Sequence, residues 1–516
     1  MTSRHIPQQE AAVVNRAEIT SAAHAVSPTT NILWFASSNL FRQVLNAGTA
    51  FLRPILLSPE LFGLFSMLRL IPNYAHHLHL GARHALRYKM PLHEAHGEHA
   101  ETDRLRATVF SGTMVIALLV SCALAAAALW IDARPEMRIG LAICAVIVLL
   151  GGVYDHFMAE LKGFQLFRAV SVQNYLHALV MLVAGAALIW WLGFYGAMLA
   201  ELVVIVAMLG VLAHRRFLKV CRGFDPALFK AAVVFGAPTL LFDVSLLLMR
   251  TTDRLVIAGT LGLEQLGYYA LGSIVMAYVM HVPGATREVM EAKLFQHNRT
   301  QDIEVQFERY VLKPIRMIGF AMPVLIGPAV LMLPFVIGWA LPSYAQGVPA
   351  MQVLMLGGFF LALSFPLRGM LVSSGRQIKA AGVLLGSVVL HVGLSYALIQ
   401  AGFGIVGVAV SAGVTFICAG AGLLVLVLRA LPRRPARLGR SLLLCLLPFP
   451  VMLAGLAMAQ SVSTATGQAP FAQLVIQLSV YGLLMGAGGL AAMRAEVIPT
   501  PRPLRTFVFG PTAPKG

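Results

Sequence analysis

The chain is poor in charged residues, and acidic residues are the scarcest of them. Only 12% of its 516 residues are Asp, Glu, Lys or Arg, whereas 58% are hydrophobic. A typical soluble domain has about 25% charged residues. This composition therefore excludes an ordinary soluble domain and indicates a chain that lies mostly within a membrane.

Cysteine is also rare, and its spacing excludes two kinds of site. The five cysteines are Cys122, Cys144, Cys221, Cys418 and Cys445. They form no CxxC pair, so we expect neither a disulfide framework nor a zinc site. The chain also lacks a phosphate-binding P-loop and a kinase-like glycine-rich loop. We therefore expect no metal, no cofactor and no catalytic residues.

Instead, the chain has a succession of apolar stretches between Asn31 and Met493. Each stretch has roughly 19 to 31 residues, which is enough for a helix to cross about 30 Å of hydrocarbon. The pattern predicts an all-α polytopic membrane protein with about 14 transmembrane helices. The predicted spans are 31–57, 60–82, 107–130, 139–160, 169–192, 194–213, 231–261, 264–286, 317–341, 350–372, 380–400, 404–428, 441–459 and 470–493.

The basic residues are distributed unevenly between the gaps that separate these spans. With the N-terminus inside, 31 of the 39 Lys and Arg residues fall in cytoplasmic segments, and only Arg134 and Arg138 in periplasmic ones. The positive-inside rule therefore predicts a bacterial inner-membrane protein with both termini in the cytoplasm. Residues 1–30 lack the apolar core of a cleavable signal peptide, so the first span is expected to direct insertion. The net charge of +17 thus reflects topology, and we expect no nucleic-acid binding.

The two halves of the predicted bundle resemble each other. Residues 58–65 (SPELFGLF) lead into the second span, and residues 262–269 (GLEQLGYY) lead into the eighth, an offset of 204. Two further pairs of segments match at offsets of 210 to 212, the first of them starting at Gly163 and Gly375. Such a pattern predicts two parallel six-helix repeats, related by an axis along the membrane normal.

The repeat also predicts how the chain is organised. The predicted parts are a cytoplasmic tail (1–30), an N-lobe with spans 1–6 (31–220), a C-lobe with spans 7–12 (221–430), and spans 13 and 14 with a second cytoplasmic tail (431–516).

A six-plus-six arrangement with two additional helices resembles the multidrug/oligosaccharidyl-lipid/polysaccharide exporter superfamily, over about residues 30–493. Residues 253–257 (DRLVI), 261–262 (LG) and 266–269 (LGYY) are similar to the signature of its polysaccharide flippase branch. The resemblance implies two six-helix lobes that form a V around a central cavity. It also implies transport by alternating access and two kinds of partner, a polysaccharide polymerase and glycosyltransferases.

Polar residues form stripes on three otherwise apolar spans. An arginine at the middle of a lipid-facing helix costs about 2.5 to 3.5 kcal/mol even on the mild insertion scale, so these residues are expected to face protein or water. At 100° per residue, the members of each stripe share one face of their helix. The stripes are Asn39, Arg42, Asn46 and Arg53 in span 1, Arg69, Asn73 and His76 in span 2, and Asp243, Arg250 and Arg254 in span 7.

The arginines suit the chemistry of a polyprenyl pyrophosphate. A guanidinium contacts phosphate oxygens through two hydrogen bonds and stays protonated when partly dehydrated. The predicted pyrophosphate-binding residues are Arg42, Arg53, Arg69, Arg250, Arg254, Asn39, Asn46 and Asn73. Asp243 is the candidate for ion coupling, because it lies deep in its span and shares a face with Arg250.

Structural roles are alternatives for several of these residues. Arg53 and Arg254 lie towards the outer ends of their spans and could snorkel to the membrane surface. Arg250 could pair with Asp243 or Asp253 as a fixed strut. For three other acids, hydrogen bonding between helices or a place at the membrane edge is preferred over ion coupling: Asp155, Glu160 and Glu201.

The sequence thus predicts a flippase and not an enzyme. The substrate would be an undecaprenyl-pyrophosphate-linked oligosaccharide, moved from the cytoplasmic to the periplasmic leaflet for assembly of O-antigen, capsule or exopolysaccharide. A lipid-II flippase, or a drug or metabolite antiporter of the same superfamily, is the alternative. A cation exporter would be expected to line its cavity with acidic and aromatic residues. A membrane-bound polymerase is disfavoured, because the longest predicted periplasmic loops have only about ten residues.

Overall fold

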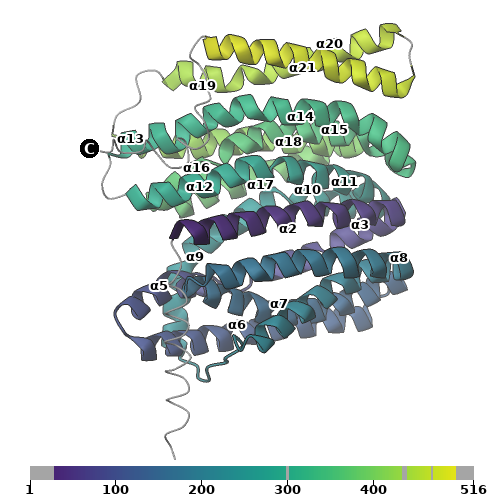
Figure 1. Cartoon of the computed structure of the whole chain (residues 1–516). Coiled ribbons are helices and arrows are strands. Elements are labelled where there is room, and N and C mark those ends of the chain that lie inside the picture. Colours follow the sequence, from purple (N-terminus) through teal and green to yellow (C-terminus); the bar gives the residue numbers. More distant parts are fainter. Residues whose placement is uncertain (1–27, 298–301, 433–437, 467–468, 495–516) are drawn as a thin grey trace, which may run out of the picture. The chain divides into compact units, whose positions relative to one another are not determined.

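The structure, a computed structural model, describes residues 28–297, 302–432, 438–466 and 469–494. All regular secondary structure within these ranges is helical (Figure 1). The predicted all-α class is therefore confirmed. Most of both predicted cytoplasmic tails, residues 1–27 and 495–516, lies outside the described residues.

The chain divides into two compact units, with the boundary between Val244 and Ser245. The helices of unit 1 are α2 (Pro28–Leu56), α3 (Pro59–Leu68), α4 (Leu70–Ala75), α5 (Ala82–Ala95), α6 (His99–Trp130), α7 (Pro135–Gly163), α8 (Phe167–His214) and most of α9 (Pro226–Met249). The predicted boundary between the lobes lies earlier, at 220/221, and the lobes themselves stay a prediction.

Unit 2 holds the end of α9 and the remaining helices, in which α15 packs against α11, α14 and α18. They are α10 (Thr252–Thr260), α11 (Leu263–Val279), α12 (His281–His297), α13 (Ile303–Phe307), the π-helix η1 (Glu308–Leu312), α14 (Lys313–Ala340), the 3₁₀-helix η2 (Pro342–Gly347), α15 (Val348–Ser364), α16 (Leu367–Ser373), α17 (Gln377–Gln400), α18 (Gly404–Leu428), α19 (Leu438–Leu446), α20 (Pro448–Thr466) and α21 (Pro470–Arg494).

In the described part of the chain, 11 helices are long and apolar enough to cross a membrane, which indicates a multi-pass membrane protein. This is three fewer than the predicted spans. The polar stripe lowers the hydropathy of α2, span 2 is interrupted at Arg69 into the short helices α3 and α4, and spans 5 and 6 are joined in α8. The count of 14 stays a prediction.

The long helix α8 reverses its direction at Gly193. The backbone there has φ 55° and ψ −123°, which glycine adopts most readily. The chain then folds back so tightly that a Cβ on Gly196 would lie 1.8 Å from the carbonyl oxygen of Leu188. Met181 of the first arm packs with Val204 of the second. The two arms of α8 therefore correspond to predicted spans 5 and 6.

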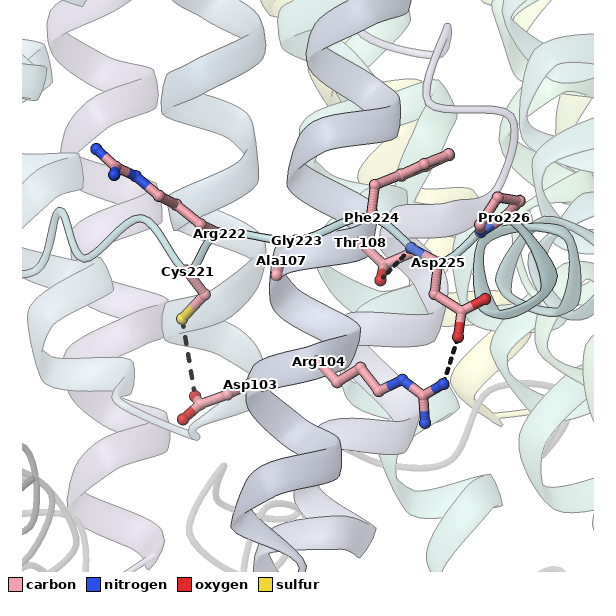
Figure 2. A pocket seen from close by; sticks show the side chains of 10 residues that line it. All are labelled: Asp103, Arg104, Ala107, Thr108, Cys221, Arg222, Gly223, Phe224, Asp225 and Pro226. Carbon is pink, nitrogen blue, oxygen red and sulfur yellow. Dashed lines mark hydrogen bonds and ion pairs between the residues drawn. The ribbon is translucent and has the colours of Figure 1, made fainter.

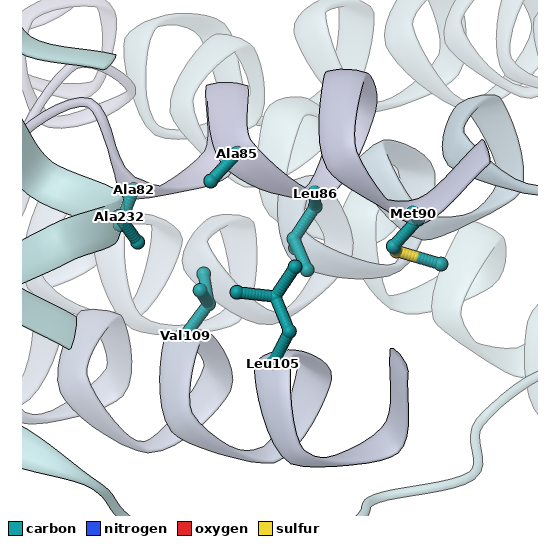
Figure 3. Packing of buried hydrophobic residues seen from close by; sticks show 7 residues of the cluster. All are labelled: Ala82, Ala85, Leu86, Met90, Leu105, Val109 and Ala232. Carbon is teal, nitrogen blue, oxygen red and sulfur yellow. The ribbon is translucent and has the colours of Figure 1, made fainter. Parts of the chain in front are cut away.

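The first half of α9 packs onto α5 and α6 through small and aliphatic residues. Figure 3 shows this cluster, which consists of Ala82, Ala85, Leu86, Met90, Leu105, Val109 and Ala232. Next to it, Gly81 has φ 93° and lies so close to Gly236 that a Cβ on Gly236 would be 2.0 Å from the carbonyl oxygen of Gly81. Any side chain at either glycine would collide with backbone, so this pair permits the contact that places the first half of α9 in unit 1.

Predicted span 7 is not one continuous helix. The helix α9 ends at Met249 and α10 begins at Thr252, with a turn at Arg250 and Thr251. Because the helical rise and rotation change at this turn, the spacing of 100° per residue does not extend across it. The face predicted to be shared by Asp243, Arg250 and Arg254 therefore stays a prediction.

Candidate functional site

Three elements of unit 1 bring two of the predicted arginines to one carboxylate. Arg53 lies near the end of α2, Arg69 at the break between α3 and α4, and Glu201 in the second arm of α8. Oε1 of Glu201 is 2.9 Å from Nη2 of Arg53 and 3.5 Å from Nε of Arg69. This carboxylate therefore joins residues from three separate parts of the sequence.

The two arginines differ in their surroundings. The side chain of Arg53 is only 3% exposed, and its guanidinium lies 4.6 Å from the centroid of the Phe65 ring, in a cation–π contact. The alternative that Arg53 snorkels to the membrane surface is therefore wrong. The side chain of Arg69, by contrast, is 46% exposed. Within the described residues its only ion pair is the one that Nε forms with Glu201, which leaves both Nη groups available.

Arg42 lies in the same region of unit 1. The charges of Arg42, Arg69 and Glu201 all act on the imidazole of His177, in the first arm of α8. Arg42 is half-buried and forms no ion pair with any other described residue. We call Arg42, Arg53, Arg69 and Glu201 the arginine site. It contains three guanidinium groups and one carboxylate, an excess of two positive charges.

The predicted asparagines have different surroundings. Oδ1 of Asn39 accepts a hydrogen bond from Nδ2 of Asn174 at 3.1 Å, which joins α2 to α8. Asn46 is half-buried one turn after Arg42, and its Oδ1 has no partner among the described residues. Asn73 is exposed on α4. The roles of all three in substrate binding stay predictions.

The other two predicted arginines lie in unit 2. Arg250 is in the turn after α9, and the charges of Arg254, Arg287 and Asp253 act on it. This unit therefore has its own surplus of guanidinium groups. Arg287 of α12 was missed by the sequence reasoning, although it lies only one residue beyond the predicted end of span 8 at 286. Binding by Arg250 and Arg254 stays a prediction.

Asp243, the predicted ion-coupling residue, lies in α9 within unit 1 and is half-buried. Its charge acts on His77, which follows α4. Its role in ion coupling stays a prediction.

The three acids form contacts between helices, which was one of the two structural roles predicted for them. Glu201 bonds to Arg53. Asp155 of α7 lies 2.5 Å from Nδ1 of His76 and 3.3 Å from Nη1 of Arg83. Glu160, one turn further along α7, is 2.7 Å from Nη2 of Arg106 and bonds to a neighbouring histidine. Each acid thus neutralises an arginine on another helix.

A separate pocket of about 530 Å³ lies beside α6 and the segment that precedes α9 (Figure 2). It is lined by Asp103, Arg104, Ala107, Thr108, Cys221, Arg222, Gly223, Phe224, Asp225 and Pro226. None of the predicted binding residues is among them. Nη2 of Arg104 is 2.5 Å from Asp225, whose carboxylate also accepts hydrogen bonds from the backbone N–H groups of Ala227 and Leu228. This pocket is therefore closed at one side by the residue that caps α9.

The capping of α9 predicts a pH dependence. The hydrogen bond from the Leu228 backbone, together with Arg104, holds the pKa of the Asp225 carboxyl below its usual value of 3.8. Because the pKa is lowered by folding, the charged carboxylate stabilises the fold above that usual value. The contribution is lost as the pH falls through the lower pKa of the folded state.

Asp225→Asn removes the charge and keeps a capping side chain. We expect the thermal unfolding midpoint of this variant to be lower than that of the wild type at about pH 7, and the difference to shrink towards about pH 3. Asp225→Ala, which also removes the cap, should remain less stable than the wild type across this whole pH range. A constant difference between wild type and Asp225→Asn would contradict the prediction.

Comparisons with known proteins complete this description. A family model described as "Polysaccharide biosynthesis protein" matches residues 55–340. A search of curated protein sequences gives no match.

Several solved structures are similar. The lipid II flippase MurJ in an inward closed conformation is 14% identical, with a TM-score of 0.65 over 89% of this chain and 100% of that chain. An inward-facing multidrug resistance MATE transporter of the MOP superfamily is 15% identical, with a TM-score of 0.58. The match covers 75% of this chain and 94% of that chain. A MOP superfamily transporter from Pyrococcus furiosus is 14% identical, with a TM-score of 0.55. The match covers 80% of this chain and 97% of that chain.

At these identities, the solved structures establish the fold alone. The family model covers more than half of the chain, so its description applies to the chain as a whole. The predicted superfamily is thereby confirmed. The chain belongs to the polysaccharide biosynthesis protein family and has the fold of the MOP superfamily transporters.

Proposed function

We propose that this protein is a flippase for an undecaprenyl-pyrophosphate-linked oligosaccharide, which it moves from the cytoplasmic to the periplasmic leaflet. The observation that carries the proposal is the arginine site, which contains three guanidinium groups and the single carboxylate of Glu201, in contact with two of them. A surplus of positive charge in an otherwise apolar bundle attracts a multiply charged anion and repels a cation. This favours a pyrophosphate over the cationic substrate of a drug exporter.

The members of the arginine site are suited to different tasks. The exposed Nη groups of Arg69 can form the paired hydrogen bonds that a guanidinium offers to phosphate oxygens. Arg53 is buried and fixed by Phe65, so it holds Glu201 in position. Arg42 adds a further positive charge, which has no ion-pair partner among the described residues. Transport of this kind makes and breaks no covalent bond, so the protein acts as a transporter and not as an enzyme.

The proposal extends to the surroundings of the protein. Its place is the inner membrane of a bacterium, with both termini in the cytoplasm, as the distribution of basic residues favours. Its product would be used for O-antigen, capsule or exopolysaccharide, by a polymerase that acts after glycosyltransferases have built the repeat unit.

A lipid-II flippase is the second candidate. The observation that favours it is the similarity to MurJ, which extends over the whole of that chain. Lipid II and lipid-linked oligosaccharides share the polyprenyl pyrophosphate group, so the arginine site suits both. The family description favours the polysaccharide substrate.

Deletion of the gene tests the proposal. We expect loss of surface polysaccharide and accumulation of lipid-linked repeat units in the cytoplasmic leaflet, both reversed by the wild-type gene. Cell lysis with accumulated lipid II would instead support the second candidate. Normal polysaccharide together with an altered drug-resistance profile would overturn both and favour an antiporter.

A further inference from the structure

The arginine site has one feature that anion binding alone does not require. A carboxylate would weaken a pyrophosphate site by occupying its cationic groups, yet Glu201 contacts two of the three arginines. Its side chain is 24% exposed and is therefore within reach of groups that enter the site. The difference between its contact with Arg53 and its contact with Arg69 indicates what this carboxylate does in the site.

The two contacts of Glu201 are unequal. Its bond to Arg53 is short, at 2.9 Å, and Arg53 is fixed by burial and by its contact with Phe65. Its contact with Arg69 is longer, at 3.5 Å, and involves only Nε of a half-exposed side chain. We therefore expect the contact with Arg53 to persist, whereas the contact with Arg69 can be broken at a low cost in free energy.

We propose that Glu201 is an internal counter-ion, which holds Arg69 while the site is empty and releases it when a pyrophosphate binds. This inference rests on the proposed function. When Arg69 turns to the pyrophosphate, Glu201 keeps its bond to Arg53 and is not left as an unpaired buried charge. After the substrate has left, Glu201 recaptures Arg69 and the site returns to its empty state.

Glu201 and the pyrophosphate would compete for Arg69, and this competition has a measurable consequence for the affinity of the site for its substrate. A site that is available for only part of the time binds its ligand more weakly, in proportion to the fraction of molecules that are available. Release of the substrate is made easier for the same reason. Removing the competition should therefore tighten binding and slow transport, and these two effects in opposite directions distinguish a counter-ion from a simple brace.

Binding of farnesyl pyrophosphate to the purified protein in detergent, measured by calorimetry, tests the inference. Glu201→Gln should bind this probe roughly fivefold more tightly than the wild type, an estimate that corresponds to about 1 kcal/mol for the lost ion pair. In cells, the same variant should export less polysaccharide at equal membrane abundance. Glu98→Gln, which removes the charge of an exposed carboxylate that contacts Nδ1 of His93 elsewhere in unit 1, should change neither quantity.

A second variant separates the effect of the contact between Glu201 and Arg69 from the effect of the negative charge itself. It also provides a test if Glu201→Gln does not fold. Glu201→Asp keeps the negative charge but is too short to reach Arg69, so it should also bind more tightly than the wild type. If Glu201→Gln binds more weakly, or if Glu201→Asp shows no gain, the counter-ion inference is wrong. If the wild type binds farnesyl pyrophosphate no better than geranylgeraniol, the proposed function itself fails, whatever the variants do.

Discussion

Arg69→Ala is expected to abolish most of the export of surface polysaccharide while the protein remains folded. The side chain is 46% exposed, and its only described ion pair is long, so its removal should cost less than about 1 kcal/mol of stability. Each hydrogen bond to a charged group contributes about 1.5 to 3 kcal/mol. We therefore expect about 10- to 100-fold weaker binding of the lipid-linked substrate. The measurement is surface polysaccharide and accumulated lipid-linked intermediate in a deletion strain, at matched membrane abundance.

Two variants control this experiment. Arg69→Lys keeps the charge and loses the planar pair of donors, so it should restore only part of the export. Arg134→Ala removes an exposed arginine that also pairs with one glutamate, Glu60, but lies outside the arginine site. It should leave export unchanged. Normal polysaccharide in the Arg69→Ala strain would show that Arg69 does not bind the substrate.

Arg106→Ala is expected to destabilise the protein by about 3 to 5 kcal/mol, because it leaves the buried carboxylate of Glu160 without its main partner. The side chains of Arg106 and Glu160 are only 10% and 6% exposed, and their closest atoms are 2.7 Å apart. His156, at 3.0 Å from Glu160, forms a hydrogen bond with it but does not supply the charge of the lost guanidinium. We expect low membrane abundance and a strongly lowered unfolding midpoint in detergent.

The double variant Arg106→Met with Glu160→Leu removes both charges and should recover most of this loss. Arg104→Ala provides the matched control, because Arg104 lies on the same helix and pairs with Asp225, but its side chain is 58% exposed. Its loss should cost less than about 1 kcal/mol. If the double variant were as unstable as Arg106→Ala, the prediction would be wrong. The ion pair between Arg106 and Glu160 would then stabilise the protein in its own right, and not only by neutralising two buried charges.

The sequence predicted the all-α class correctly, but it overlooked two buried arginines and one that is partly buried. Arg83, Arg106 and Arg287 each lie one residue outside a predicted span, at 82, 107 and 286 respectively. The predicted spans end next to these three arginines, because a charge at the edge of an apolar stretch is expected to lie outside the hydrocarbon, where an isolated charge is costly. The structure removes that cost by pairing Arg83 with Asp155 and Arg106 with Glu160 on α7.

Helical periodicity was reliable only within unbroken helices. Arg42 and Arg53 belong to the single helix α2, so their shared face could be inferred from their spacing. Span 7 contains a turn at Arg250, and the segment that follows it, from Thr251 to Arg254, is more polar than the end of the helix before it. A face shared by Asp243 and Arg254 therefore cannot be inferred from spacing alone across this turn.

The sequence by itself determined that the chain consists of membrane-spanning helices, because crossing a bilayer depends on the composition of contiguous residues. It also placed Arg42, Arg53 and Arg69 within predicted spans. Only the tertiary structure decided which of those charges meet. Arg53 and Glu201 are separated by 148 positions, and their contact arises because α2 packs along the reversed helix α8. Apolar surfaces of similar composition can pack in many ways, so nothing local in the sequence specifies that pairing.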